Sequence, residues 1–129
     1  MPISKTPWKK LLHNIQVSGR RAKAMTNKRK GIDLEINITE KELEEIYNQQ
    51  NGKCFWFNIP IEINAILEKG NLLSMSADRI DNDKGYVKEN IVICCRLANL
   101  GRQNCDFDKF KNIIKYIREY KDEQVSNNI

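Results

Sequence analysis

The chain has 129 residues, of which 40% are hydrophobic and 30% are charged, so we expect one domain with a modest core. No apolar run approaches the roughly 20 residues that span a bilayer, and the stretch MPISKTPWKKLLHN lacks the apolar region of a signal peptide. These features predict an intracellular protein that does not enter a membrane. Four cysteines are too few for a disulfide framework.

Positive charge is concentrated at the amino end of the chain. Residues 1–31 hold nine of the 22 basic side chains and none of the 17 acidic ones. Trp8, Leu11, Ile15 and Ala22 recur at helical spacing, so we interpret residues 1–31 as a basic helical arm, which Gly19 could interrupt. This distribution favours contact with a nucleic acid over a merely solvated helix face. The residues predicted to bind the nucleic-acid backbone are Lys9, Lys10, Arg20, Arg21, Lys23, Lys28, Arg29 and Lys30.

The remaining pattern predicts an α+β domain over residues 32–121. Thr39 and Glu42 form a capping box that begins a second helix, which ends near Asn51 and Gly52. KCFWFN and IPIEI then indicate a hairpin or an irregular β segment. LLSMSADRI reads as a strand, NDKGY as a turn, NIVICC as a second strand and RLANLGRQN as a helix. Asp106 or a neighbour caps a final amphipathic helix, and residues 122–129 form a frayed tail.

An acidic turn lies between the two predicted strands. Asp78, Asp81, Asn82 and Asp83 are all turn-forming residues, and that structural role accounts for most of this stretch. It does not account for Asp78, because a carboxylate inside a strand is costly to bury unless it is paired or coordinates a cation. The carboxylate of Asp78 and the side-chain carbonyl of Asn99 on the following helix are ligands that suit Mg²⁺.

The stretch SADRIDNDKGYVKENIVICCRLANLGR resembles the HNH endonucleases, or ββα-metal nucleases, and in particular the small HNH-like proteins of phages and other viruses. The resemblance covers roughly residues 20–117 and implies a ββα-metal core that cleaves double-stranded DNA as a monomer or a homodimer. It implies that Asp78 and Asn99 bind Mg²⁺, or alternatively Mn²⁺. It further implies that Asn90 braces the loop and that Arg102 faces a phosphate.

This chain departs from the family pattern at Arg79, where the general-base histidine is usual. Arginine is permanently charged and cannot accept a proton. Another branch of the superfamily has Asp-Arg-Gly-His here, and the resemblance to it implies that Asp81 takes the position of the base; the alternative is that bulk base activates the water. We expect Arg79 to hold the phosphate. A protein that binds DNA without cutting it is the alternative, and the arm could instead bind RNA or an acidic protein. The only histidine, His13, is assigned to a phosphate or surface contact. We expect no structural zinc, because paired Cys-x-x-Cys motifs are missing around Cys54, Cys94, Cys95 and Cys105.

Overall fold

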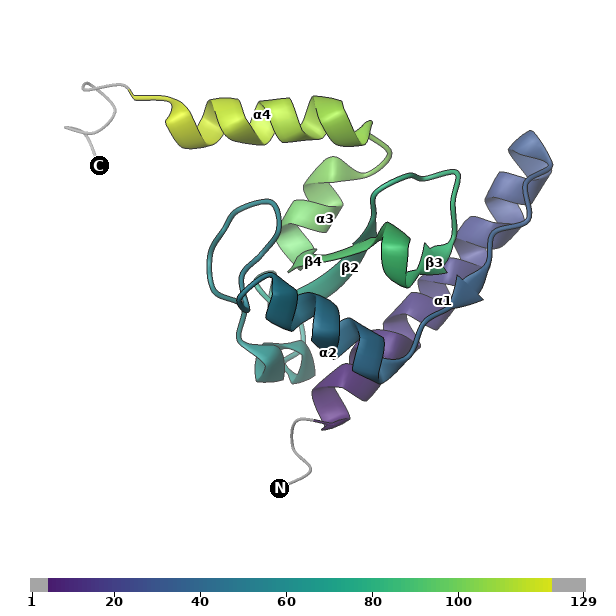
Figure 1. Cartoon of the computed structure of the whole chain (residues 1–129), viewed down its shortest axis with the longest axis horizontal. Coiled ribbons are helices and arrows are strands. Elements are labelled where there is room, and N and C mark those ends of the chain that lie inside the picture. Colours follow the sequence, from purple (N-terminus) through teal and green to yellow (C-terminus); the bar gives the residue numbers. More distant parts are fainter. Residues whose placement is uncertain (1–4, 122–129) are drawn as a thin grey trace.

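The structure is a computed structural model that describes residues 5–121, and it mixes helices and short strands (Figure 1). This composition confirms the predicted α+β class. The predicted tail at residues 122–129 lies outside the described residues. In chain order the elements are α1 (Lys5–Lys30), β1 (Ile36–Asn37), α2 (Glu40–Gln49), the 3₁₀ helix η2 (Ile63–Leu67), β2 (Met75–Arg79), β3 (Tyr86–Val87), the 3₁₀ helix η3 (Lys88–Asn90), β4 (Ile91–Cys95), α3 (Arg96–Arg102) and α4 (Phe107–Glu119).

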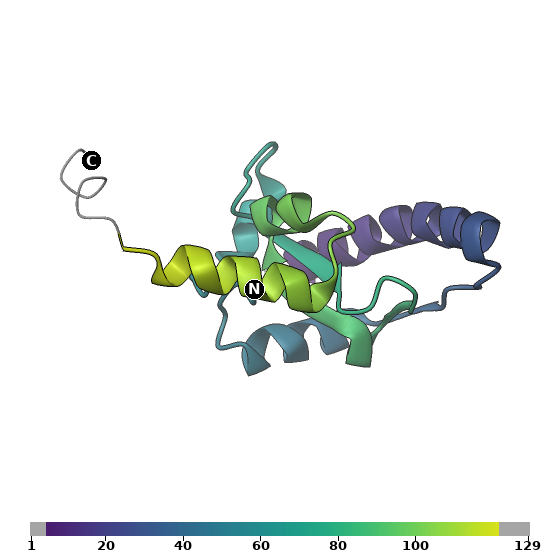
Figure 2. The same cartoon turned by 90° about the horizontal axis from the view of Figure 1, so that it is seen from above.

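Helix α1 runs without a break, so Gly19 does not interrupt it. Gly19 instead permits close packing, since a Cβ there would lie 2.9 Å from Cδ1 of Ile36. Trp8, Leu11 and Ile15 are buried in the main core, and the second half of the helix extends away from the body of the molecule (Figures 1 and 2). The first half of the predicted arm therefore belongs to the domain itself.

Helix α2 begins at the predicted capping box. The hydroxyl of Thr39 accepts from the backbone N–H of Glu42 at 3.1 Å, and the Glu42 carboxylate accepts from the Thr39 N–H at 3.0 Å. Beyond the carboxyl end of α2, the Gln50 amide donates to the carbonyl of Ile93 at 2.7 Å and accepts from its N–H at 2.8 Å. Gln50 thus pairs with the edge of β4 much as a neighbouring strand would.

The strands β2 and β4 form an antiparallel pair, in register from Met75 opposite Cys95 to Arg79 opposite Ile91. All five residues of β4 are buried, and α3 begins at the residue that follows the strand. The short β3 lies between β2 and β4 along the chain, and it pairs in parallel with β1 in a separate two-stranded sheet. The segment of residues 53–62 is irregular, with one isolated bridge between Lys53 and Pro60. The strand–strand–helix order predicted for residues 74–102 is confirmed.

Helix α4 is capped by Asp106, whose carboxylate accepts from the backbone N–H of Asp108 at 3.1 Å and of Lys109 at 3.2 Å. Its buried residues, Phe110 and Ile114, lie on the side that packs toward the core, and the rest of the helix projects from the body (Figure 1). No helix within residues 5–121 is both long enough and apolar enough to cross a bilayer.

Candidate functional site

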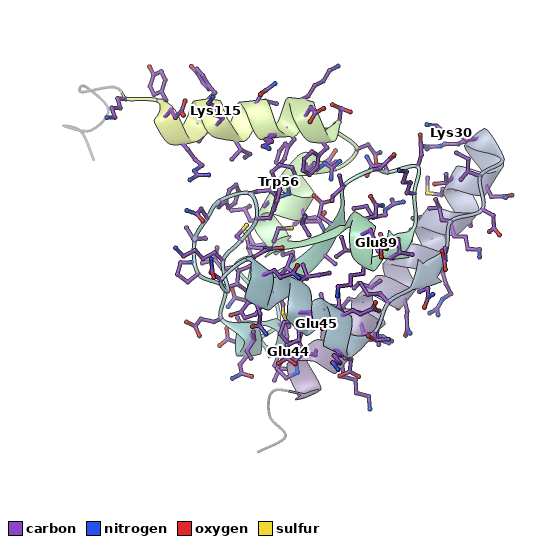
Figure 3. The ribbon with its side chains drawn as sticks, in the orientation of Figure 1. Lys30, Glu44, Glu45, Trp56, Glu89 and Lys115 are labelled. Atoms are coloured by element: carbon purple, nitrogen blue, oxygen red, sulfur yellow. The ribbon has the colours of Figure 1, made fainter. Side chains whose placement is uncertain are left out.

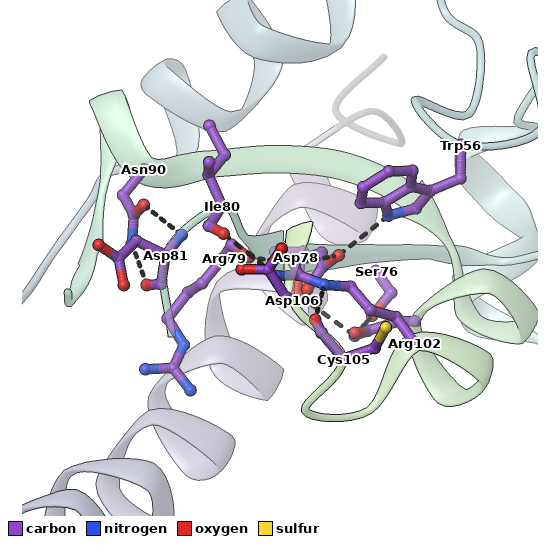
Figure 4. A network of polar contacts seen from close by, with 12 residues as sticks. Trp56, Ser76, Asp78, Arg79, Ile80, Asp81, Asn90, Arg102, Cys105 and Asp106 are labelled. Atoms are coloured by element: carbon purple, nitrogen blue, oxygen red, sulfur yellow. Dashed lines mark hydrogen bonds and ion pairs between the residues drawn. The ribbon is translucent and has the colours of Figure 1, made fainter. Parts of the chain in front are cut away.

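Two neighbouring polar contacts join β2 to α3. Ser76 and Asp78 lie two residues apart and therefore on the same face of the strand, and Asn99 and Arg102 lie one turn apart on the helix. The Asn99 amide donates to the Ser76 hydroxyl at 2.8 Å and to the Ala77 carbonyl at 3.3 Å. The Arg102 guanidinium donates to Asp78 at 2.9 Å (Figure 4). Asn99 thus bonds to Ser76 and Ala77 of β2, and Arg102 on the same helix bonds to Asp78, the next residue of that strand.

The ion pair between Asp78 and Arg102 is buried, with side-chain exposures of 6% and 1%. The indole N–H of Trp56 donates to the same carboxylate oxygen at 2.9 Å, and the guanidinium lies 5.7 Å from the Trp56 ring centre. Arg102 is therefore the internal counter-ion of Asp78. The resemblance implied that Arg102 faces a phosphate, but its guanidinium is buried in this structure. Its remaining donors bond to the backbone carbonyls of Arg79, Ile80 and Cys105.

Each predicted metal ligand is held through one polar atom and keeps an unused oxygen. Trp56 and Arg102 both bond to Oδ2 of Asp78, and nothing within residues 5–121 donates to Oδ1. The Ala77 carbonyl can only accept, so Asn99 must turn its Nδ2 toward it. In the same described range no donor reaches the Asn99 Oδ1.

A carboxylate oxygen and an amide carbonyl oxygen are the donors that Mg²⁺ prefers, and Mg²⁺ sites in proteins typically use few side chains with water and phosphate completing the shell. The contacts to Arg102, Trp56 and Ser76 fix how the two side chains are oriented, as partners of metal ligands commonly do. The part of the chain that the structure describes holds no group of three or more His, Cys, Asp or Glu side chains suited to a metal.

The acidic loop after β2 is braced from inside by Arg79 and Asn90. Arg79 donates to the carbonyls of Asn82 at 2.8 Å and Lys84 at 3.2 Å, and its guanidinium lies 4.9 Å from the ring centre of Tyr86. Asn90, which is 5% exposed, accepts from the N–H of Asp81 at 2.9 Å. Its amide donates back to the carbonyls of Asp81 at 3.0 Å and Gly85 at 2.9 Å (Figure 4). Arg79 is therefore directed into the loop in this structure.

The predicted catalytic residues do not share one cavity, because Asn99 and Asp81 line two different hollows. A cleft of about 690 Å³ lies between α1, β2 and α3, and it is lined by Asn99 and by His13 of α1. A second hollow of about 460 Å³ contains Asp81, whose Oδ1 accepts from the N–H of Asp83 at 2.9 Å. Asp78 lines neither of them. The structure thus brings His13, which the sequence assigned to a surface contact, onto the same cleft as Asn99.

The exposed basic residues of α1 differ in their partners. Lys23 forms an ion pair with Asp33 at 3.1 Å, and Lys30 at the far end of the helix pairs with Asp83 at 2.9 Å (Figure 3). The other exposed basic side chains of α1 make no ion pair within residues 5–121: these are Lys9, Lys10, Arg20, Arg21, Lys28 and Arg29.

Lys10, Arg21 and Lys28 share one face of α1, and we call them the basic stripe. Lys10 and Lys28 are 18 residues apart, which is five helical turns, and Arg21 lies between them at nearly the same angle. Lys10 also lines the cleft. By contrast, Glu44 and Glu45 lie on α2, away from the free end of α1 (Figure 3). The stripe therefore extends from the cleft outward along the basic end of the helix.

Cys54, Cys94 and Cys95 are buried free thiols, and Cys105 is a half-buried one. The sulfur atoms of Cys54 and Cys95 are 4.0 Å apart. Burial, followed by the nearby Asp78 carboxylate, raises the pKa of the Cys94 thiol well above 9.0, and burial also raises the pKa of Cys95. Zinc binds the deprotonated thiolate, and the raised pKa values of Cys94 and Cys95 disfavour that deprotonated form.

Comparisons of the chain with family models, with curated proteins and with solved structures give no match. The fold class is α+β, with an antiparallel strand pair followed directly by a helix.

Proposed function

We propose that this protein is a metal-dependent DNA endonuclease of the HNH type, which hydrolyses phosphodiester bonds in double-stranded DNA. The observation that carries the proposal is the arrangement of Asp78 and Asn99. They lie on β2 and α3, which pack together, and each is anchored through one polar atom while a second oxygen stays unused. The sequence resemblance described above supports the same assignment.

Each residue of the site has a role in this proposal. Asp78 and Asn99 would hold Mg²⁺ or Mn²⁺, which supplies electrostatic stabilisation of a phosphate and of its departing oxygen. Arg102 and Trp56 keep the Asp78 carboxylate in one orientation, and Ser76 does the same for Asn99. The basic stripe contacts the DNA backbone, since lysine and arginine gain affinity by releasing the counterions of phosphates.

One observation favours a second candidate, a DNA-binding protein that does not cut. A buried carboxylate requires a positive partner, and Arg102 already supplies one to Asp78 at 2.9 Å. Asp78 is thereby satisfied without a metal ion, and Arg79 stands where the family has its catalytic histidine. In this case the ββα unit would serve only to support α1.

Incubation with supercoiled plasmid separates the two candidates. We expect nicking with Mg²⁺ or Mn²⁺, no nicking with a chelator, and a loss of about 100-fold or more in Asn99→Ala. Asn99 is half-buried, so this variant should keep the far-UV circular dichroism of the wild type. Leu97→Ala is the matched control, because Leu97 is 46% exposed on the same helix, lies outside the lining of the cleft and should cut normally.

One outcome would overturn the nuclease assignment, and another would overturn the metal site within it. Retardation of the plasmid without cutting in either metal would establish the binding protein instead. Normal cutting by Asn99→Ala would remove the proposed metal site.

A further inference from the structure

Hydrolysis of a phosphodiester requires a group that accepts the proton of the attacking water, and the residues predicted from the motif do not fill this role in the cleft. Arg79 cannot accept a proton and is bonded to the carbonyls of Asn82 and Lys84. Asp81 lines the other hollow and holds the turn at Asp83. A side chain that accepts the proton within this cleft would therefore come from another part of the chain.

The cleft beside Asn99 contains one imidazole. His13 projects from α1, and Ser76 and Asn99 lie on the β2 and α3 walls of the same cleft. His13 is exposed, and none of its ring atoms is bonded within residues 5–121. The charged groups that line the cleft with it are Lys10 on α1, Glu68 and Lys69 after η2, and Arg96 on α3.

We propose that His13 is the proton acceptor of the reaction, supplied from α1 across the cleft rather than from β2. This inference rests on the proposed endonuclease function. The water oxygen forms a bond to phosphorus, and the bond from phosphorus to the 3′ oxygen breaks. The water proton passes to a ring nitrogen of His13, and the departing 3′ oxygen takes a proton from solvent. His13 then returns its proton to solvent.

Imidazole suits this role because histidine is the side chain that ordinarily exchanges a proton near neutral pH. The lysines and the arginine around the cleft favour the approach of a phosphate from its open side. His13 also belongs to the helix that carries the basic stripe, so DNA bound along α1 would be brought past the imidazole.

Glu68 is the competing acceptor, since it is the carboxylate that lines the cleft. Its carboxylate is engaged with the Asn71 amide at 2.6 Å, which satisfies one of its oxygens. Glu68→Gln is therefore the matched control for His13→Gln. Both substitutions remove a proton acceptor at an exposed position and keep a side chain of similar size.

The activity test compares metal-dependent plasmid nicking by these variants. We expect His13→Gln to lose at least about 100-fold, Glu68→Gln to stay close to the wild type, and imidazole in the buffer to restore part of the activity of His13→Ala. The affinity of His13→Gln for a labelled duplex should differ from that of the wild type by less than about threefold, because most of the affinity comes from the basic side chains that contact phosphates.

A second readout does not depend on activity. The chain has one histidine, so its ring protons give a single set of nuclear magnetic resonance signals. We expect Mn²⁺, which is paramagnetic, to broaden these signals in the wild type and to leave them sharp in Asn99→Ala.

The outcomes distinguish the two proposals. Normal nicking by His13→Gln, or His13 signals that stay sharp while Mn²⁺ supports cutting, would overturn the role of His13 and leave the nuclease intact. Loss of activity in Glu68→Gln but not in His13→Gln would assign the proton to Glu68. Absence of nicking in the wild type would reject the proposed function and this inference with it.

Discussion

Replacing Arg102 by methionine removes the guanidinium that neutralises Asp78 while keeping most of the aliphatic volume. The Asp78 carboxylate would then be buried, at 5% exposure, with the Trp56 indole as its remaining donor. Removing one member of a buried ion pair typically costs about 3–5 kcal/mol, because the other charge is left without compensation. We expect a loss of that size, a large fraction of the roughly 5–15 kcal/mol that stabilises a domain.

Urea denaturation followed by circular dichroism and tryptophan fluorescence measures this loss. Lys88→Met is the control, since Lys88 and Glu45 form a pair at 3.1 Å with exposures of 35% and 43%. Such a pair contributes at most about 1 kcal/mol. The double variant Asp78→Asn with Arg102→Met should be more stable than Arg102→Met alone, because no charge is then buried. If Arg102→Met is no less stable than Lys88→Met, the reasoning about the buried pair is refuted.

Two further predictions concern pH and salt. The raised pKa of Cys94 keeps its proton on in the folded state above about pH 9, where the unfolded chain loses it, so the free energy of unfolding should fall by up to about 1.4 kcal/mol per pH unit. Urea titrations between about pH 8.5 and 10 should show a shallower decline for Cys94→Ala, and equal slopes would contradict this. Replacing Arg21 and Lys28 together by alanine should lower the affinity for a labelled duplex and reduce the salt slope by about 2, as measured by fluorescence anisotropy. Lys111→Ala on α4 is the control, and an equal loss there would argue against the basic stripe.

Local signals in the sequence were sufficient for most elements of the fold. The capping box at Thr39 and Glu42 defines the start of α2, because both bonds of the box are made between residues three apart. The pattern around Asp78 likewise predicts β2, the turn and β4, since alternation and turn formers act over a few residues. Asp106 caps α4 as its position suggested.

Contacts between segments that lie far apart in the sequence could not be predicted from such local signals. The sequence indicates that a buried Asp78 needs either a partner or a cation, but it does not indicate that Arg102, 24 positions later, is that partner. The spacing of Asn99 and Arg102 places both on one face of α3, and only the packing of α3 on β2 shows that this face is covered. His13 reaches the cleft for the same reason, since its helix is packed against β2 by residues far from the motif.

The anchoring of α1 in the core has a consequence for the size of the proposed contact with DNA. Trp8, Leu11 and Ile15 fix the helix to the domain, so the basic stripe keeps one position relative to the cleft. From Lys10 to Lys28 the stripe is about 27 Å long, since each residue of a helix rises about 1.5 Å. At about 3.4 Å per base pair this length matches about eight base pairs of duplex. A nuclease of this design would protect a short, one-sided footprint next to the bond that it cuts, with a length set by a helix rather than by a second domain.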